Sequence, residues 1–206
     1  ALQSLQKWTA QPRIRSGDQI RARTKDPTLM HTNKREFSMK TPYQIQYEAF
    51  AAAGGLYDER HAKLYAEFAE NPIADGSFSI VYEGVAHACY TPLIIDKAPQ
   101  LKCYVLAPLA VLPEYQRKGY ATRLMEEAEK QLDADVIFVM GEPFHYGNRY
   151  NTPHKVLPPV RTQAPLECWF AREITPGAVD DIGDSTSSVT GPYAAPLMWG
   201  HPSEQV

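Results

Sequence analysis

The residues with the clearest chemical potential form a short polar run, Gln116 to Ala121, between an apolar segment and an amphipathic one. The first turn of a helix leaves four backbone N–H groups without partners, and the helix dipole adds positive potential there. Gly119 has no Cβ, so an anion can approach the main chain closely, and Arg117 and Lys118 add two cations. This combination predicts a binding site for a diphosphate group, built mostly from backbone.

Taken alone, the pattern of this run is weak. From average composition, an amide or basic residue followed by x-x-Gly-x-small occurs by chance roughly once in five chains of this length. An ordinary strand-to-helix turn with solvated basic residues is the alternative interpretation, and the flanking elements decide between the two. The expected anion-binding residues are Gln116, Arg117, Lys118, Gly119, Tyr120, Ala121 and Thr122.

The flanking segments predict buried strands and a helix. Residues 103–112 are almost wholly apolar between polar turns, which is typical of a strand buried on both faces. Pro108 cannot donate a ladder hydrogen bond, so we expect a break or bulge there, a feature often found beside active sites. Residues 119–133 have the apolar spacing of an amphipathic helix, and residues 136–140 form a second apolar strand. This order predicts a βαβ unit with parallel neighbours.

The first third of the chain divides into a polar segment and two predicted helices. Residues 1–40 have little periodicity, although residues 20–24 alternate like a short edge strand. Helical apolar spacing begins near residue 43 and ends at the Gly54–Gly55 pair. It begins again near residue 58 and ends before Pro72.

The remaining elements are mostly strands. Residues 77–82 and 85–95 are rich in β-branched and aromatic residues and are joined by a predicted turn at Glu83–Gly84. Pro143 can begin a short helix that runs to about Tyr150. Residues 167–174 predict a last strand, and the segment after residue 175 is expected to be mostly loop.

Composition excludes several classes of protein. Apolar residues make up 44% and charged residues 22% of the 206, which is typical of a soluble globular domain. A net charge of −3 argues against nucleic acid as the main partner, and no run approaches the roughly 18–20 apolar residues that cross a bilayer. The three cysteines and six histidines are scattered without metal-site spacing, so we expect no metal and a reducing, cytoplasmic location.

The central part of the chain resembles a known family. The run Leu106 to Ala121 (LAPLAVLPEYQRKGYA) is similar to the acyl-CoA-binding core of the GNAT superfamily of N-acetyltransferases, and in particular to its YhbS-like branch. Residues 91–96, 138–146 and 176–178 are similar to further stretches of that branch. The resemblance covers about residues 77–178, whereas the first seventy or so residues match poorly.

The resemblance implies the fold class. We expect an α/β domain with a GNAT-type mixed, mostly antiparallel central sheet, flanked by helices, whose two middle strands splay apart to admit the cofactor. The chain then divides into an N-terminal extension, residues 1–40, and an acetyltransferase domain, residues 41–206. Ala107 and Ala121 replace glycines of the branch pattern and Glu142 replaces an aspartate, so the acceptor side is expected to differ from typical members.

The activity that the resemblance implies is direct transfer of an acetyl group from acetyl-CoA to a primary amine of a small metabolite or a protein. The backbone of Leu109, Ala110 and Val111 is expected to contact the pantetheine arm, and one N–H there to stabilise the oxyanion. Tyr146 is the expected catalytic acid that protonates the leaving thiolate, because a phenol is protonated at neutral pH.

The sequence leaves open which base takes the proton of the amine. Glu48, Asp96, Glu142 and His145 are candidates. Glu142 ranks first because it follows a buried strand at the end where α/β sites open. Aromatic residues more often pack a core than line a pocket. Those that could line an acceptor pocket are Tyr43, Tyr47, Phe50, Trp169, Tyr193 and Trp199.

Two other functions fit the same residues. A non-catalytic acyl-CoA sensor or interaction module of the same fold would bind acetyl-CoA equally well. A βαβ nucleotide binder is the third interpretation, but the chain has no G-x-G-x-x-G run followed by an acidic residue about 20 positions later. A homodimer is compatible with each of them.

Overall fold

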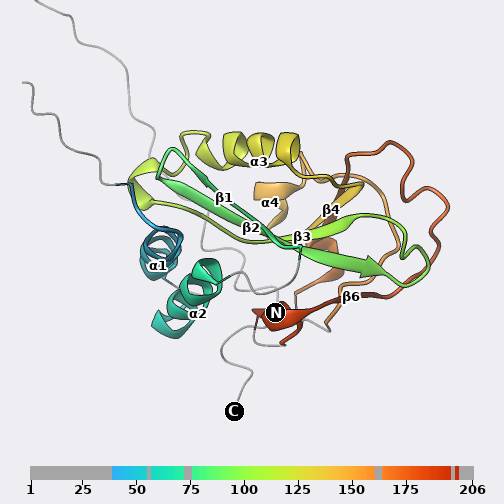
Figure 1. Ribbon diagram of the computed structural model, residues 1–206, viewed down its shortest axis with the longest axis horizontal. Coiled ribbons are helices and arrows are strands. Elements are labelled where there is room, and N and C mark those ends of the chain that lie inside the picture. The colour runs from blue at the N-terminus through green and yellow to red at the C-terminus, as the bar shows by residue number, and fades with distance from the viewer. Residues whose placement is uncertain (1–38, 55–56, 72–75, 161–163, 196–197, 200–206) are drawn as a thin grey trace, which may run out of the picture. The chain divides into compact units, whose positions relative to one another are not determined.

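The computed structural model describes residues 39–54, 57–71, 76–160, 164–195 and 198–199. In this part of the chain a six-stranded sheet has the order β1-β2-β3-β4-β5, and β6 pairs with β2 (Figure 1). The edge strand predicted at residues 20–24 lies outside the described residues.

The elements follow the predicted order along the chain. The strands are β1 (Phe78–Tyr82), β2 (Ala86–Ile95), β3 (Cys103–Val111), β4 (Val136–Met140), β5 (Trp169–Glu173) and β6 (Ser187–Val189). The helices are α1 (Pro42–Ala53), α2 (Glu59–Glu70), α3 (Tyr120–Gln131) and α4 (Pro143–Tyr146), with 3-10 turns η2 (Pro113–Tyr115), η3 (Leu166–Cys168) and η4 (Gly191–Ala194).

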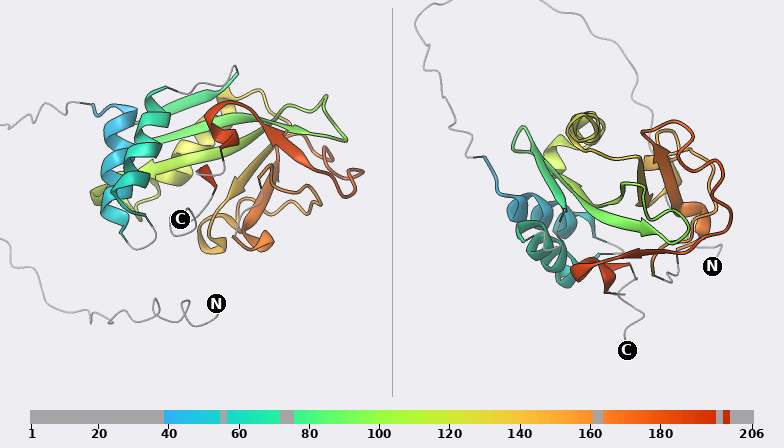
Figure 2. Two further views of the ribbon diagram at one scale, coloured as in Figure 1. Left: turned by 90° about the horizontal axis from the view of Figure 1, so that it is seen from below. Right: turned by 45° about the vertical axis from the view of Figure 1, so that its right-hand side comes forward.

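The sheet is mixed, as the fold class predicts. β3 and β4 are parallel and are joined through α3, which confirms the βαβ unit. The other described strand pairs are antiparallel. Helix α3 lies on one face of the sheet, and α1 and α2 lie on the other (Figure 2). None of the described helices has the length and apolar character of a membrane span.

Two apolar layers cover the two faces of the sheet. Strand β4 contributes to both, because successive side chains of a strand point to opposite faces. Ile137 and Val139 pack in the layer beneath α3, whereas Val136 and Phe138 pack in the layer on the other face. All four side chains are buried, which confirms that β4 is covered on both sides.

Strand β3 has the irregularity predicted at Pro108. Ala88 of β2 pairs with Leu109, and Tyr90 pairs with Leu106. Two residues of β3, Ala107–Pro108, therefore stand opposite the single residue Cys89. This is the pattern of a β-bulge, in which the strand bends and its ladder is interrupted.

Beyond this region the two parallel strands diverge. The pairing of β3 with β4 covers only Cys103–Val105 against Val136–Phe138. From Leu106 to Val111, β3 has no described strand beside it on the β4 side. This divergence is the predicted splay, and it leaves one edge of β3 without ladder partners.

Two predicted boundaries were wrong. The segment after residue 175 contains β6, whose three residues pair with Leu93–Ile95 of β2. A strand of this length is too short to produce a period in the sequence, so only the tertiary contact reveals it. Helix α4 ends at Tyr146 rather than near Tyr150, although the Tyr150 N–H still donates to the Tyr146 carbonyl at 2.8 Å.

Candidate functional site

The start of α3 has the open backbone that anion binding requires. Gly119 is the N-cap and has φ 81°, a left-handed conformation that glycine adopts without strain. Arg117 also has positive φ, at 59°. Among the described residues, no acceptor is bonded to the backbone N–H groups from Arg117 to Thr122. These groups are therefore free to bind an anion together with the helix dipole.

A cation that the sequence analysis placed only on the solvent face, Arg123, belongs to this turn. Its guanidinium donates to the Lys118 carbonyl at 2.7 Å and lies 4.6 Å from the centroid of the Tyr120 ring. The Lys118 ammonium lies 5.7 Å from the centroid of the Tyr115 ring. Arg123 thus occupies a carbonyl of the turn and adds a third cation beside Arg117 and Lys118.

Gln116 has a different role from the one predicted. Its side-chain Nε2 donates to the Val111 carbonyl at 3.0 Å, so the amide ties the turn to the end of β3. Gln116 therefore positions the turn, and its side chain is already engaged within the protein.

The exposed edge of β3 presents two of the three predicted backbone positions. The Leu112 N–H donates to the Val85 carbonyl at 2.9 Å, and Ala110 is paired with His87. Backbone groups alternate between the two sides of an antiparallel strand, so those of Ala110 face β2. Those of Leu109 and Val111 face the opposite side, where β4 has diverged.

Tyr146 stands at the carboxyl end of β4, held by the start of α4. Its ring lies directly against Gly141, where an added Cβ would come within 2.6 Å of the Tyr146 Cδ2. Burial, together with the neighbouring phenol of Tyr57, raises the pKa of Tyr146 to about 12. The side chain is therefore a protonated phenol at neutral pH, as a general acid must be.

Glu142 and Tyr57 join Tyr146 at this end of the sheet. Glu142 is the N-cap of α4 but makes no side-chain capping bond, and its carboxylate is exposed. Burial and the charge of Glu142 raise the pKa of Tyr57. The hydroxyl of Tyr57 therefore lies within electrostatic range of both predicted catalytic residues, Glu142 and Tyr146.

The sequence analysis missed Tyr57, which is placed by the start of α2. Asp58 caps that helix by accepting from the His61 backbone N–H at 3.1 Å and contacts its Nδ1 at 2.7 Å. The Tyr57 ring packs edge-on against Phe50 at 5.0 Å between centroids and against Tyr65 at 6.2 Å. Three aromatic rings thus support Tyr57 where its hydroxyl faces α4.

Two further phenols, Tyr65 and Tyr193, lie near the same place. Burial is the main cause that raises the pKa of each, and Tyr57 adds to it in both. Tyr146 adds to the shift of Tyr193. Tyr57, Tyr65, Tyr146 and Tyr193 come from α4, η4 and the α2 region, so only the fold brings them together.

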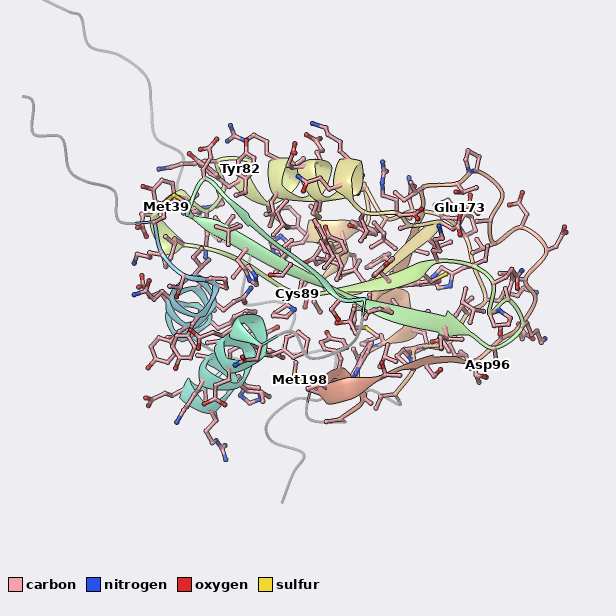
Figure 3. The ribbon with its side chains drawn as sticks, in the orientation of Figure 1. Met39, Tyr82, Cys89, Asp96, Glu173 and Met198 are labelled. Atoms are coloured by element: carbon pink, nitrogen blue, oxygen red, sulfur yellow. The ribbon has the colours of Figure 1, made fainter. Side chains whose placement is uncertain are left out.

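The other candidate bases lie elsewhere or are already paired. Glu48 forms an ion pair with Lys40. Asp96 follows β2 at the end opposite Tyr82 (Figure 3), whose ring contacts Tyr120 at the start of α3, and it accepts from Thr186. His145 is exposed on α4, beside Tyr146.

Most of the predicted aromatic lining is structural. Tyr43 and Tyr47 stack on each other on α1. The indole of Trp169 donates to the Val156 carbonyl at 3.0 Å, and that of Trp199 donates to the Tyr193 carbonyl at 2.6 Å, both in the core. Phe50 lies behind Tyr57, and Tyr193 is the one residue of this set within electrostatic range of Tyr146.

A buried cysteine and histidine lie at the bulge, but their hydrogen bonds rule out nucleophilic catalysis. The Cys89 Sγ is 3.8 Å from Nε2 of His87. Gln46 Nε2 donates to Nδ1 of His87 at 2.9 Å and to its carbonyl at 3.2 Å, so Nδ1 is the unprotonated nitrogen and Nε2 carries the hydrogen. Burial also raises the pKa of Cys89 to about 12. Histidine in this tautomer cannot take the thiol proton.

No group of three or more potential metal ligands could hold an ion in the described part of the chain. A mixed sheet with a diverging parallel pair, beside a helix start with unpartnered amides, defines an acyltransferase that binds its donor through a diphosphate. Residues 29–139, more than half of the chain, match the family model described as Acetyltransferase (GNAT) family. The chain belongs to this family, whose acetyl donor is acetyl-CoA.

Solved structures show the same fold at low sequence identity. YhbS, a GNAT N-acetyltransferase from Escherichia coli in complex with CoA, is 16% identical over 72% of this chain and 84% of its own, with a TM-score of 0.53. A GNAT acetyltransferase from Brucella melitensis in complex with acetyl-CoA is 17% identical over 73% of this chain and 88% of its own, with a TM-score of 0.49. A search of curated proteins gives no match.

Proposed function

We propose that this protein is an N-acetyltransferase that transfers an acetyl group from acetyl-CoA directly to a primary amine. The observation that carries this proposal is the row of unpartnered amides at the start of α3, beside the divergence of β3 and β4 and on the same domain as Tyr146. The similar YhbS structure was solved with CoA, which supports the choice of ligand.

The residues at the turn fit the diphosphate of acetyl-CoA. The amides from Arg117 to Thr122 would bind its oxygens, and the cations of Arg117, Lys118 and Arg123 would balance its charge. Leu109 and Val111 would bind the pantetheine arm through their free backbone groups. When bound, acetyl-CoA supplies an acetyl group activated as a thioester.

The side chains at the end of β4 supply the proton transfers. Glu142 is the proposed base, because its exposed carboxylate can attract the ammonium form of the acceptor and take its proton through water. A backbone N–H of Leu109 or Val111 would stabilise the oxyanion. Tyr146 would protonate the leaving sulfur. Tyr57, within electrostatic range of both residues, would orient the amine between them.

The direct test is acetyl-CoA binding followed by turnover. Isothermal titration should detect acetyl-CoA at micromolar concentration, and release of free thiol should depend on an added amine. No binding at high micromolar concentration would contradict the proposal, and binding without turnover of any amine would favour an acyl-CoA sensor instead.

Reversing one charge at the turn is expected to weaken acetyl-CoA binding. Lys118→Glu places a carboxylate beside the bound diphosphate and should raise the Kd at least tenfold, measured by calorimetry. Lys130→Glu is the matched control, since it makes the same charge change near the other end of α3, where Lys130 pairs with Glu127 at 3.3 Å. Equal effects of the two variants would contradict a diphosphate site at the turn.

Removing the buried thiol is expected to spare catalysis. Cys89→Ala should keep kcat within about twofold, because the Cys89–His87 pair has the wrong tautomer for nucleophilic attack. The loss of buried sulfur should lower the free energy of unfolding by about 1–2 kcal/mol. Turnover and denaturant unfolding measure the two effects. Loss of turnover, or an acetyl adduct on Cys89 in mass spectrometry, would argue for an acyl-enzyme.

A further inference from the structure

Two apolar side chains project from the surface at the carboxyl end of β4, where the proposed acceptor site opens. Phe144 is 89% exposed and Leu166 is 60% exposed. Phe144 belongs to α4, just after β4, and Leu166 belongs to η3, just before β5. The two turns adjoin, since the Gly141 N–H donates to the Cys168 carbonyl at 2.9 Å, next to the last ladder pair of β4 and β5.

Two unpaired carboxylates border these side chains. Glu142 and Glu167 are both exposed, and neither forms an ion pair with any of the described residues. Burial raises the pKa of the Cys168 thiol, and the charges of Glu142 and Glu167 raise it further, so both carboxylates lie near this sulfur. Tyr57, 38% exposed, is a third apolar surface within electrostatic range of Glu142.

We propose that Tyr57, Glu142, Phe144, Leu166 and Glu167, together the acceptor rim, bind a polypeptide whose reacting amine has apolar neighbours in sequence. This inference rests on the proposed acetyl transfer and specifies its acceptor. The two carboxylates complement the positive charge of a lysine side chain or an amino terminus and disfavour acidic neighbours. The apolar side chains would pack against the residues beside the amine.

The shape of the rim favours a polypeptide over a small amine. A small ligand is usually held in a concave site that buries most of its surface. Phe144 stands almost wholly in solvent and cannot enclose such a ligand. An extended segment can instead lie across a projecting side chain while its amine reaches inward to Glu142. Exposed apolar side chains that cluster at one place are typical of such interaction sites.

The test uses the full chain, acetyl-CoA and four acceptors, with free thiol as the readout. Three peptides of equal length carry a lysine and a free amino terminus, flanked by leucine and phenylalanine, by serine, or by aspartate. Butylamine presents the same reacting group without neighbours. The apolar peptide is expected to have a kcat/KM at least tenfold above those of the serine peptide and butylamine, and the aspartate peptide should be slowest.

Variants at the rim separate docking from chemistry. Phe144→Ser and Leu166→Ser change exposed side chains and should leave the fold intact. Each is expected to lower kcat/KM for the apolar peptide five- to tenfold, through KM, and to leave butylamine turnover unchanged. Leu157→Ser is the matched control, because Leu157 is also exposed but lies in the segment whose backbone bonds to Ser185.

The outcomes distinguish this inference from the proposed function. If butylamine reacts as well as the apolar peptide and the rim variants change nothing, the acceptor rim is overturned while acetyl transfer stands. If no acceptor reacts and acetyl-CoA does not bind, acetyl transfer fails and the acceptor rim fails with it. Preference for the aspartate peptide would also overturn the inference.

Discussion

Replacing Tyr146 by phenylalanine is expected to lower kcat at least a hundredfold while the Kd of acetyl-CoA stays within about twofold. The substitution removes only the hydroxyl, and the ring keeps its position against Gly141. A phenol with a pKa of about 12 is protonated throughout the neutral range, so it is available to give its proton to the leaving sulfur. Steady-state kinetics and calorimetry measure the two quantities separately.

The neighbouring tyrosine supplies the control. Tyr150 is fully buried, its ring centroid lies 5.9 Å from that of Tyr146, and its hydroxyl contacts the Met125 sulfur at 3.7 Å. Tyr150→Phe should therefore keep kcat. If Tyr146→Phe also keeps kcat, Tyr146 is not the acid. An unchanged Kd in a protein that turns over no amine would point to an acyl-CoA sensor.

Gly141 offers a second way to test the same hydroxyl. Its backbone is in an ordinary conformation, so Gly141→Ala introduces no φ strain, but the new methyl group would overlap the Tyr146 ring. The ring must move, and a displaced acid costs rate even though its chemistry is intact. Gly141→Ala should therefore resemble Tyr146→Phe, with low kcat and a nearly unchanged Kd of acetyl-CoA.

Local chemistry explains which parts of the site were predictable. Pro108 lacks an N–H wherever it stands, so a break in an apolar strand follows from one residue, and the bulge is found there. The amphipathic repeat of α3 and Gly119 at its start likewise place an open helix end between two buried strands. The coenzyme side of the site therefore lies within one contiguous stretch of sequence.

The acceptor side was not predictable in the same way. Tyr57 and Tyr146 are far apart in sequence, and no period or spacing relates them, so only the packing of α2 beside α4 reveals their proximity. Strand β6 is recognised by its pairing with β2 rather than by its three residues. The direction of the Ala110 backbone depends on the register with His87, which a sequence pattern does not contain.

The two halves of the site differ in the same physical sense. The α3 turn binds by backbone groups, whose positions follow from the helix and from Gly119. The acceptor side depends on the side chains of Glu142, Tyr57 and Tyr146, carried by separate elements. Substitutions at the turn should therefore change mainly the Kd of acetyl-CoA, whereas those at the end of β4 should change the rate and the choice of acceptor.

Acid is expected to destabilise the fold through His87, before most carboxylates titrate. The ring is fully buried between Gln46 and Ser79, with bonds of 2.9 Å to each, and burial lowers its pKa from 6.5 to about 4. Between these values the unfolded chain binds a proton that the folded protein does not. The free energy of unfolding is therefore highest above pH 6.5 and should fall by about 3 kcal/mol as the pH drops to 4.

Denaturant unfolding at a series of pH values between 7.5 and 4 would measure this slope, with those limits chosen roughly to bracket the two His87 pKa values. His87→Gln removes the titrating ring and should flatten the curve by about one proton, whereas the exposed His145→Gln should leave it unchanged. Carboxylates act in a lower range: the backbone N–H of Lys102 lowers the pKa of Asp135, so its contribution is lost only below its unfolded value of 3.8. A slope that persists in His87→Gln would show that another group binds the proton on unfolding.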